Sequence, residues 1–185
     1  MKKKGLALVL ALTLLVVGVV AGTLAWLTAK SDTVTNTFTT SDIKVELKET
    51  PKEYKMIPGY TISKDPTATV LDGSEECYLF VKLDESTNFD DYMTYEMADG
   101  WTKLKGVAGT VYYRVVDGTS NKIGTPYSVL KDNQVTVKDT VTKKMMETAE
   151  KDKPTLTVTA YASQLHKNAT DIFDPSDAWN NIANK

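Results

Sequence analysis

The stretch Glu76-Cys77-Tyr78-Leu79-Phe80-Val81-Lys82-Leu83 is the most hydrophobic part of the chain beyond its N-terminal region. A β-strand turns successive side chains to opposite faces of its sheet. Here one face receives the thiol and the aliphatic side chains at positions 77, 79, 81 and 83, and the other receives two aromatic rings and one lysine. A short run that is apolar on both faces is typical of the interior of a sheet, so residues 76–83 are predicted to form a central strand.

Residues on both sides of this stretch carry further strand signals. Residues 43–49 alternate strictly between apolar and charged side chains, and residues 110–116 and 155–165 also alternate with a period of two. Shorter strands are expected within residues 61–71, which Pro66 divides, and at 101–105, 127–130 and 134–137. A weaker strand signal lies in the threonine-rich residues 33–39.

Three segments depart from this strand pattern. Residues 140–151 place apolar side chains at four-residue intervals among lysines and glutamates, which predicts a helix. Asp174 can cap a second short helix that has Pro175 at its first position. Residues 84–100 are expected to form a loop with one helical turn near residues 89–93. Many short strands with one or two peripheral helices predict a mainly β fold, an antiparallel jelly-roll-like β-sandwich.

The N-terminus has the layout of a secretory signal peptide. Three lysines, at positions 2 to 4, precede an apolar run over residues 6–20. Thr23 and Ala25 then suit the −3 and −1 positions of a signal peptidase site. Cleavage is expected between Ala25 and Trp26, with Ala21 and Ala29 as less favoured exits. The predicted organisation is a signal peptide at residues 1–25, an extended segment at 26–39 and a sandwich domain at 40–185.

An uncleaved membrane anchor is the alternative interpretation of the leader. Its apolar character continues to Leu27 and approaches the ~20 residues that span a bilayer. The protein would then be a membrane-anchored binding domain at the cell surface. Both interpretations place the sandwich domain outside the cytoplasm, as a secreted or cell-surface protein.

Composition argues against nucleic acid as a partner. The formal net charge is −2 for the whole chain, and it becomes more negative when the leader and its three lysines are removed. Acidic and basic residues are otherwise interspersed, which is typical of a solvated surface. Cys77 is the single cysteine, so no internal disulfide can form, and its apolar surroundings predict a buried, inert thiol.

The sequence shows no arrangement that predicts catalysis or metal binding. A hydrolytic zinc site commonly uses the motif His-Glu-x-x-His, but His166 is the only histidine, and it lies in a polar loop. The oxygen-bearing residues at 84, 86, 88 and 90 have the spacing of the first ligands of a calcium loop. Phe89 stands where that loop needs glycine and Tyr95 where it needs glutamate, so calcium is not expected. We predict no enzymatic activity, no catalytic residue, no metal and no cofactor.

Several stretches match a known family in chain order. The leader exit reads GTLAWLTAKS at residues 22–31 and is followed by FTTSDIKV at 38–45. IPGYTI at 57–62 precedes YLFVKL at 78–83, and VTAYASQ occupies 158–164. Together they resemble the TasA/camelysin family of secreted biofilm-matrix fibre proteins. The leader is similar to those cut by the SipW-type signal peptidase, which would be a partner during export.

The resemblance implies a structural subunit of biofilm-matrix fibres that polymerises with itself, head to tail, with other matrix proteins as further candidate partners. The mechanism would be donor-strand complementation, in which an extended segment of one subunit pairs with an open sheet edge of the next. The donor would be residues 26–39, with Trp26, Leu27, Val34 and Phe38 as anchors. The alternatives are that this segment pairs within its own subunit or is only a tether. Because camelysin-like proteins have been classed as metallopeptidases, a secreted metal-dependent peptidase is a further alternative.

Overall fold

The computed structural model describes residues 42–50 and 55–183. All of them belong to one of the chain's two compact units, Thr40–Lys185. The predicted signal peptide, the cleavage site between Ala25 and Trp26, the strand signal at 33–39 and the predicted donor anchors Trp26, Leu27, Val34 and Phe38 lie outside the described residues.

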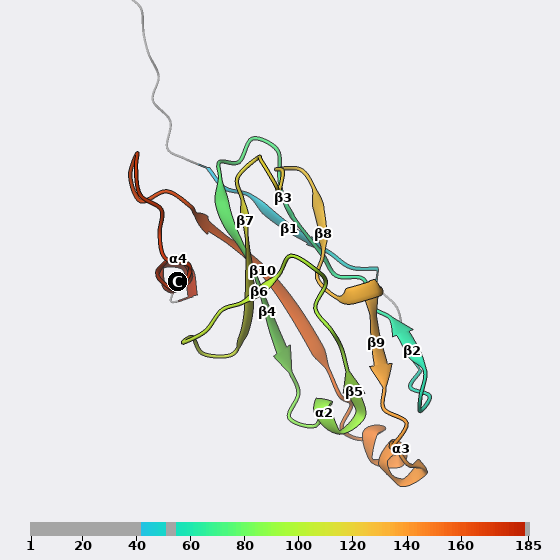
Figure 1. Cartoon of the computed structure of the whole chain (residues 1–185). Coiled ribbons are helices and arrows are strands. Elements are labelled where there is room, and N and C mark those ends of the chain that lie inside the picture. Colours follow the sequence, from blue (N-terminus) through green and yellow to red (C-terminus); the bar gives the residue numbers. More distant parts are fainter. Residues whose placement is uncertain (1–41, 51–54, 184–185) are drawn as a thin grey trace, which may run out of the picture. The chain divides into compact units, whose positions relative to one another are not determined.

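The described strands form three antiparallel sheets (Figure 1). The four-stranded sheet has the order β10-β4-β7-β6, formed by Leu156–Gln164, Cys77–Glu85, Thr110–Val116 and Thr102–Lys103. One three-stranded sheet has the order β1-β3-β8, formed by Val45–Lys48, Thr67–Val70 and Pro126–Ser128. The other has the order β2-β9-β5, formed by Thr61–Ser63, Gln134–Val137 and Met93–Thr94.

Two continuous chain segments each supply one strand to both three-stranded sheets. β2 leads into β3 past Pro66, and β8 leads into β9 through the 3-10 turn η1 (Lys131–Asn133). β2 pairs with β9 and β3 pairs with β8, so these segments form one layer that is interrupted in the middle. Proline has no N–H for a strand ladder, and the Pro66 carbonyl instead accepts a 2.9 Å hydrogen bond from the Val129 amide. The predicted break at Pro66 is therefore confirmed.

The main hydrophobic core lies between this interrupted layer and the four-stranded sheet. β4 contributes Leu79, Val81 and Leu83, each at most 2% exposed. The interrupted layer contributes buried residues from β3 and β9, namely Ala68, Val70, Val135 and Val137. Since β4 also has a paired strand on each side, the prediction of a central strand at residues 76–83 is confirmed.

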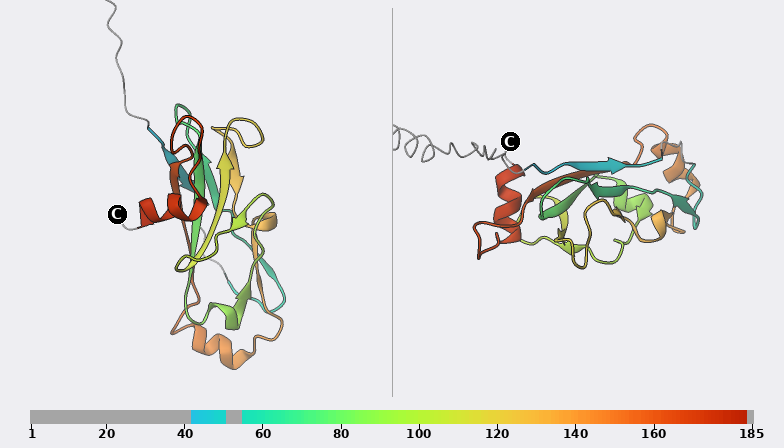
Figure 2. Two further views of the ribbon diagram at one scale, coloured as in Figure 1. Left: turned by 60° about the vertical axis from the view of Figure 1, so that its left-hand side comes forward. Right: turned by 90° about the horizontal axis from the view of Figure 1, so that it is seen from above.

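A second, smaller core lies on the other face of the four-stranded sheet. Tyr78 and Phe80 of β4 belong to it, and Trp179 joins it from helix α4 (Pro175–Ala183). Figure 2 shows the helix beside the strands. The Trp179 ring centroid lies 5.4 Å from that of Phe80 and 5.2 Å from that of Tyr161. The helix begins where predicted, because the Asp174 carboxylate accepts a 2.9 Å hydrogen bond from the Ser176 backbone amide.

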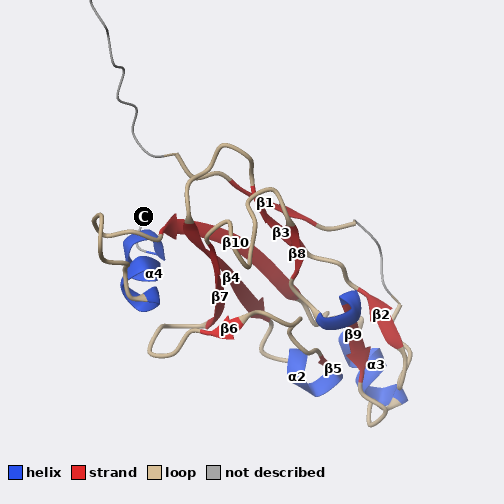
Figure 3. Cartoon of the chain, turned by 45° about the horizontal axis from the view of Figure 1, so that its top comes forward, coloured by secondary structure: helices blue, strands red, loops and turns tan. Residues whose placement is uncertain are grey.

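Helices α2 (Phe89–Tyr92) and α3 (Lys143–Ala149) lie together at the end of the domain away from α4 (Figures 1 and 3). Thr142 caps α3, and its hydroxyl oxygen accepts a 3.3 Å hydrogen bond from the Met145 amide. The Tyr92 hydroxyl donates to the Met145 carbonyl oxygen at 3.0 Å and so joins the two helices. The predicted helix within residues 140–151 and the predicted helical turn near residues 89–93 are both confirmed. Across the residues that the structure describes, every helix is too short or too polar to cross a membrane.

These elements confirm a mainly β, antiparallel fold with few short helices, and the layers are consistent with the predicted β-sandwich. The jelly-roll topology stays a prediction. The structure adds one strand that the pattern does not predict, β5, which follows α2 directly within residues 84–100. Two residues are too few to show a period, and β5 exists because β9 offers it a pairing partner.

Replacing Trp179 with alanine tests the second core. Truncation of a buried aromatic side chain costs about 3–5 kcal/mol in the free energy of unfolding, because burial is lost and a cavity remains. Trp179 is only 5% exposed, so Trp179→Ala should unfold at a clearly lower urea concentration than the parent. Asn181→Ala, at an exposed position of the same helix, is the control and should leave the midpoint nearly unchanged. Equal midpoints for the two variants by circular dichroism would contradict this packing.

Candidate functional site

Strand β10 is an open edge of the four-stranded sheet. All nine of its residues pair with β4 on one side, from Leu156 opposite Glu85 to Gln164 opposite Cys77. No described strand pairs with its other side, since β1 packs beside β10 but pairs only with β3. The strand reads LTVTAYASQ and contains neither a charged residue nor a proline. Such residues are the usual protection of an edge strand, so β10 is open to pairing with an extended segment.

The other described edge strands are shorter or carry charges. β6 and β5 have two residues each, and β2 has three. β8 also has three residues and begins with Pro126. β1 carries Glu46 and Lys48, whose side chains form an ion pair at 2.8 Å. Of these edges, β10 is therefore the one best suited to accept another strand.

A pocket of about 530 Å³ lies at the start of β10, and we call it the methionine pocket. Its apolar lining residues are Met56, Ile62, Phe89, Met93, Val135, Met146, Ala149, Pro154 and Leu156, and its polar ones are Lys64, Glu150, Lys153 and Thr155. Methionine is flexible and polarizable, and it is common on surfaces that adapt to a partner. Leu156 both lines the pocket and begins β10, so the pocket and the open edge are continuous.

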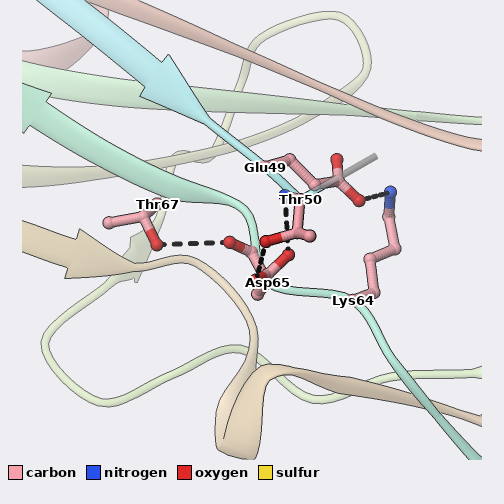
Figure 4. Close-up of polar contacts among 5 residues, drawn as sticks. All are labelled: Glu49, Thr50, Lys64, Asp65 and Thr67. Atoms are coloured by element: carbon pink, nitrogen blue, oxygen red, sulfur yellow. Dashed lines mark hydrogen bonds and ion pairs between the residues drawn. The ribbon is translucent and has the colours of Figure 1, made fainter. Parts of the chain in front are cut away.

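A polar cluster fixes one wall of the methionine pocket where β1, β2 and β3 meet (Figure 4). The Lys64 ammonium lies 2.8 Å from the Glu49 carboxylate. Thr50 donates its backbone amide and its hydroxyl to the Asp65 carboxylate, at 3.0 and 2.7 Å. The Thr67 hydroxyl donates to the Asp65 carbonyl oxygen at 3.2 Å. These contacts hold the end of β1 against the β2–β3 connection, and they position Lys64 at the pocket.

The calcium-like segment 84–90 holds another wall in place. The Ser86 hydroxyl donates to the Asn88 side-chain oxygen at 2.6 Å and accepts a 2.9 Å hydrogen bond from the Thr155 amide. The Asn88 side-chain amide donates to the Asp152 carbonyl oxygen at 2.8 Å. These bonds fix the chain just before β10. In the described part of the chain, no three His, Cys, Asp or Glu side chains come together as a metal site would need.

His166 and Cys77 lie in very different surroundings. His166 is exposed, and its Nε2 lies 2.7 Å from Glu76 Oε2. Cys77 is fully buried, and this burial raises the pKa of its thiol to about 12. Such a thiol stays protonated at neutral pH, and the thiolate is the reactive form. The predicted burial of Cys77 is confirmed.

Sequence reasoning missed the buried guanidinium of Arg114 on β7, which is 7% exposed. Its central carbon lies 4.6 Å from the Trp101 ring centroid and 4.1 Å from that of Tyr127, and Nη2 donates to the Asp99 carbonyl oxygen at 2.8 Å. Burial lowers the pKa of Arg114. The stack joins β7 to β8, so Trp101 and Tyr127 pack within the domain. The sequence signal that could have found this site is an arginine at an inward-facing position of the alternating residues 110–116.

Comparisons of this chain with protein-family models, with curated proteins and with solved structures return no match. The relation to the TasA/camelysin family therefore stays a prediction.

The buried thiol supplies a prediction about reactivity. At pH 8 the native protein should react with a thiol reagent far more slowly than protein unfolded in guanidinium chloride, because access and ionisation are both suppressed. The added thiol of Lys144→Cys, at an exposed position of α3, is the positive control and should react at once. Burial raises the Cys77 pKa in the folded state, so the unfolded chain loses this proton at a lower pH than the folded chain does. The free energy of unfolding should therefore fall as the pH rises from 9.0 towards 12. Native labelling of Cys77 as fast as position 144 would contradict the structure.

Proposed function

We propose that this protein is a secreted structural subunit of extracellular matrix fibres that assembles head to tail by donor-strand complementation. The observation that carries the proposal is the open edge of β10, nine residues long and without charge or proline. An unpaired edge leaves backbone N–H and C=O groups without ladder partners, and an extended segment of another chain can pair with them.

The proposed donor is the segment 26–39, with Trp26, Leu27, Val34 and Phe38 as anchors. Cleavage by a SipW-type signal peptidase between Ala25 and Trp26 would free its end. The segment contains only two charged residues, and its second half is rich in threonine, with Val34 and Phe38 at even spacing. Threonine, valine and phenylalanine all favour strands, which supports the role of a donor. Other matrix proteins with a similar segment would compete for the same edge.

The chain enters β1 at the end of the domain where β10 finishes. At its start, the Lys44 amide donates to Ser74 Oγ at 3.0 Å, and the Leu71 amide donates to the Lys44 carbonyl oxygen at 2.8 Å. At its end, Glu49 pairs with Lys64 of the methionine pocket. The chain before β1 therefore joins the domain at the end remote from the pocket. A heterologous contact between the donor of one subunit and the β10 edge of the next would yield a filament when it does not close.

Removal of the donor tests this function. The secreted chain beginning at Trp26 should form filaments visible by electron microscopy after concentration at neutral pH, and the chain beginning at Thr40 should stay monomeric. The control keeps the full length but replaces Leu27, Val34 and Phe38 with serine, which separates apolar anchoring from simple tethering. This control should also fail to polymerise. Filaments formed equally well by the chain beginning at Thr40 would contradict strand donation by residues 26–39.

A further inference from the structure

We propose that the methionine pocket binds a long-chain fatty acid, with the hydrocarbon chain among the methionine side chains and the carboxylate at the ammonium of Lys64. This binding site goes beyond the proposed function. It needs only residues within 55–183 and Glu49, so it does not depend on strand donation or on a second copy of the chain.

The pocket has the size and the lining of a site for an apolar ligand. Its volume of about 530 Å³ falls within the ~300–1,000 Å³ that is typical of ligand pockets. Most of its lining residues are apolar, and Met56, Met93 and Met146 are among them. Methionine side chains are flexible and adapt to the shape of what they contact. This lining suits a hydrocarbon chain, which is itself flexible.

Lys64 brings a partly buried positive charge to this apolar surface. Its side chain is 14% exposed, and its ammonium lies 2.8 Å from the Glu49 carboxylate (Figure 4). A lysine ammonium has three N–H donors, and within the described residues Glu49 is the one acceptor that it contacts. A charge that is shielded from water needs hydrogen-bond partners in place of the water it has lost. An anionic head group in the pocket would accept the remaining donors.

The charges around the pocket favour an anionic head group over a cationic one. Lys64 lines the pocket and its partner Glu49 does not, so the pocket faces the ammonium of this ion pair. The other charged lining residues are Glu150 and Lys153, which are both exposed and offset one another. The partly buried ammonium of Lys64 therefore decides which sign of charge the pocket prefers.

A hydrocarbon chain fits the pocket better than a peptide strand does. Thr155, the polar lining residue beside β10, already has both of its backbone groups paired. Its amide donates to the Ser86 hydroxyl at 2.9 Å, and its carbonyl oxygen accepts from the Ser86 amide at 3.0 Å. A peptide among the apolar side chains would leave its own amide groups unpaired, which costs free energy. A hydrocarbon chain has no polar group along its length.

NMR of methionine methyl groups tests the inference. Decanoate is added to a dilute solution of the secreted chain, beginning at Trp26, with isotope-labelled methionine methyls. The signals of Met56, Met93 and Met146 should shift and then saturate. Met97 does not line the pocket, so its signal is the internal control and should stay in place. Decyltrimethylammonium, which has the same chain length and the opposite charge, should bind at least about tenfold more weakly, because it loses the charged hydrogen bond to Lys64 and is repelled by it.

A variant pair separates the head-group contact from the apolar pocket. Glu49→Gln/Lys64→Gln removes the ion pair without leaving a partly buried charge alone, and it should weaken decanoate binding by about tenfold. Lys144→Gln, at an exposed position of α3 outside the pocket, is the control and should bind as the parent does. Unchanged thermal unfolding of both variants ensures that the comparison concerns folded protein.

Three results would overturn the inference. The first is a set of pocket methionine signals that do not move with decanoate, or that move no more than the signal of Met97. The second is equal affinity for decanoate and decyltrimethylammonium, which would remove the anionic head group. The third is binding only to vesicles of anionic phospholipid, which would assign the surface to a membrane and not to a free fatty acid.

Discussion

The pairing of β4 with β10 is the interaction on which the rest of the structure depends. β4 is buried on both faces, because Leu79 and Val81 enter the main core while Tyr78 and Phe80 enter the core under α4. Its position in the middle of the four-stranded sheet therefore organises both cores at once. One side of β4 is occupied by the full length of β10, and this leaves the other side of β10 as a long edge.

An uncharged edge strand of this length can pair with other chains and aggregate unless a defined segment covers it. Each backbone hydrogen bond that a donor strand forms contributes about 0.5–1.5 kcal/mol net, so several of them can hold two subunits together. Backbone pairing alone sets the register weakly, since every residue offers the same groups. The side chains of the donor must then fix the register, because a slip of one residue would turn its apolar side chains to the other face of the sheet.

The sequence predicts the local elements well and the site poorly, for physical reasons. Alternation at residues 76–83, the proline at 66 and the cap at Asp174 act on nearby backbone, so their consequences can be predicted from short stretches. The methionine pocket has no such signal, because Met56, Met93 and Met146 come from separate segments that only the fold brings together. That β10 lies at an edge depends on sheet order, which its own alternation does not contain. The leader and the family resemblance predict the donor segment, which lies outside the described residues.

Hydrogen exchange at β10 tests the central claim most directly. In an edge strand of an antiparallel sheet, alternate N–H groups point away from the neighbouring strand. In the monomer, the amides of residues 156–164 should therefore alternate between slow and fast exchange. In the assembled protein, the fast set should become slow, because a donor strand now accepts those hydrogen bonds. Exchange along β10 that stays the same on assembly, with new protection at another edge such as β6, would contradict the account.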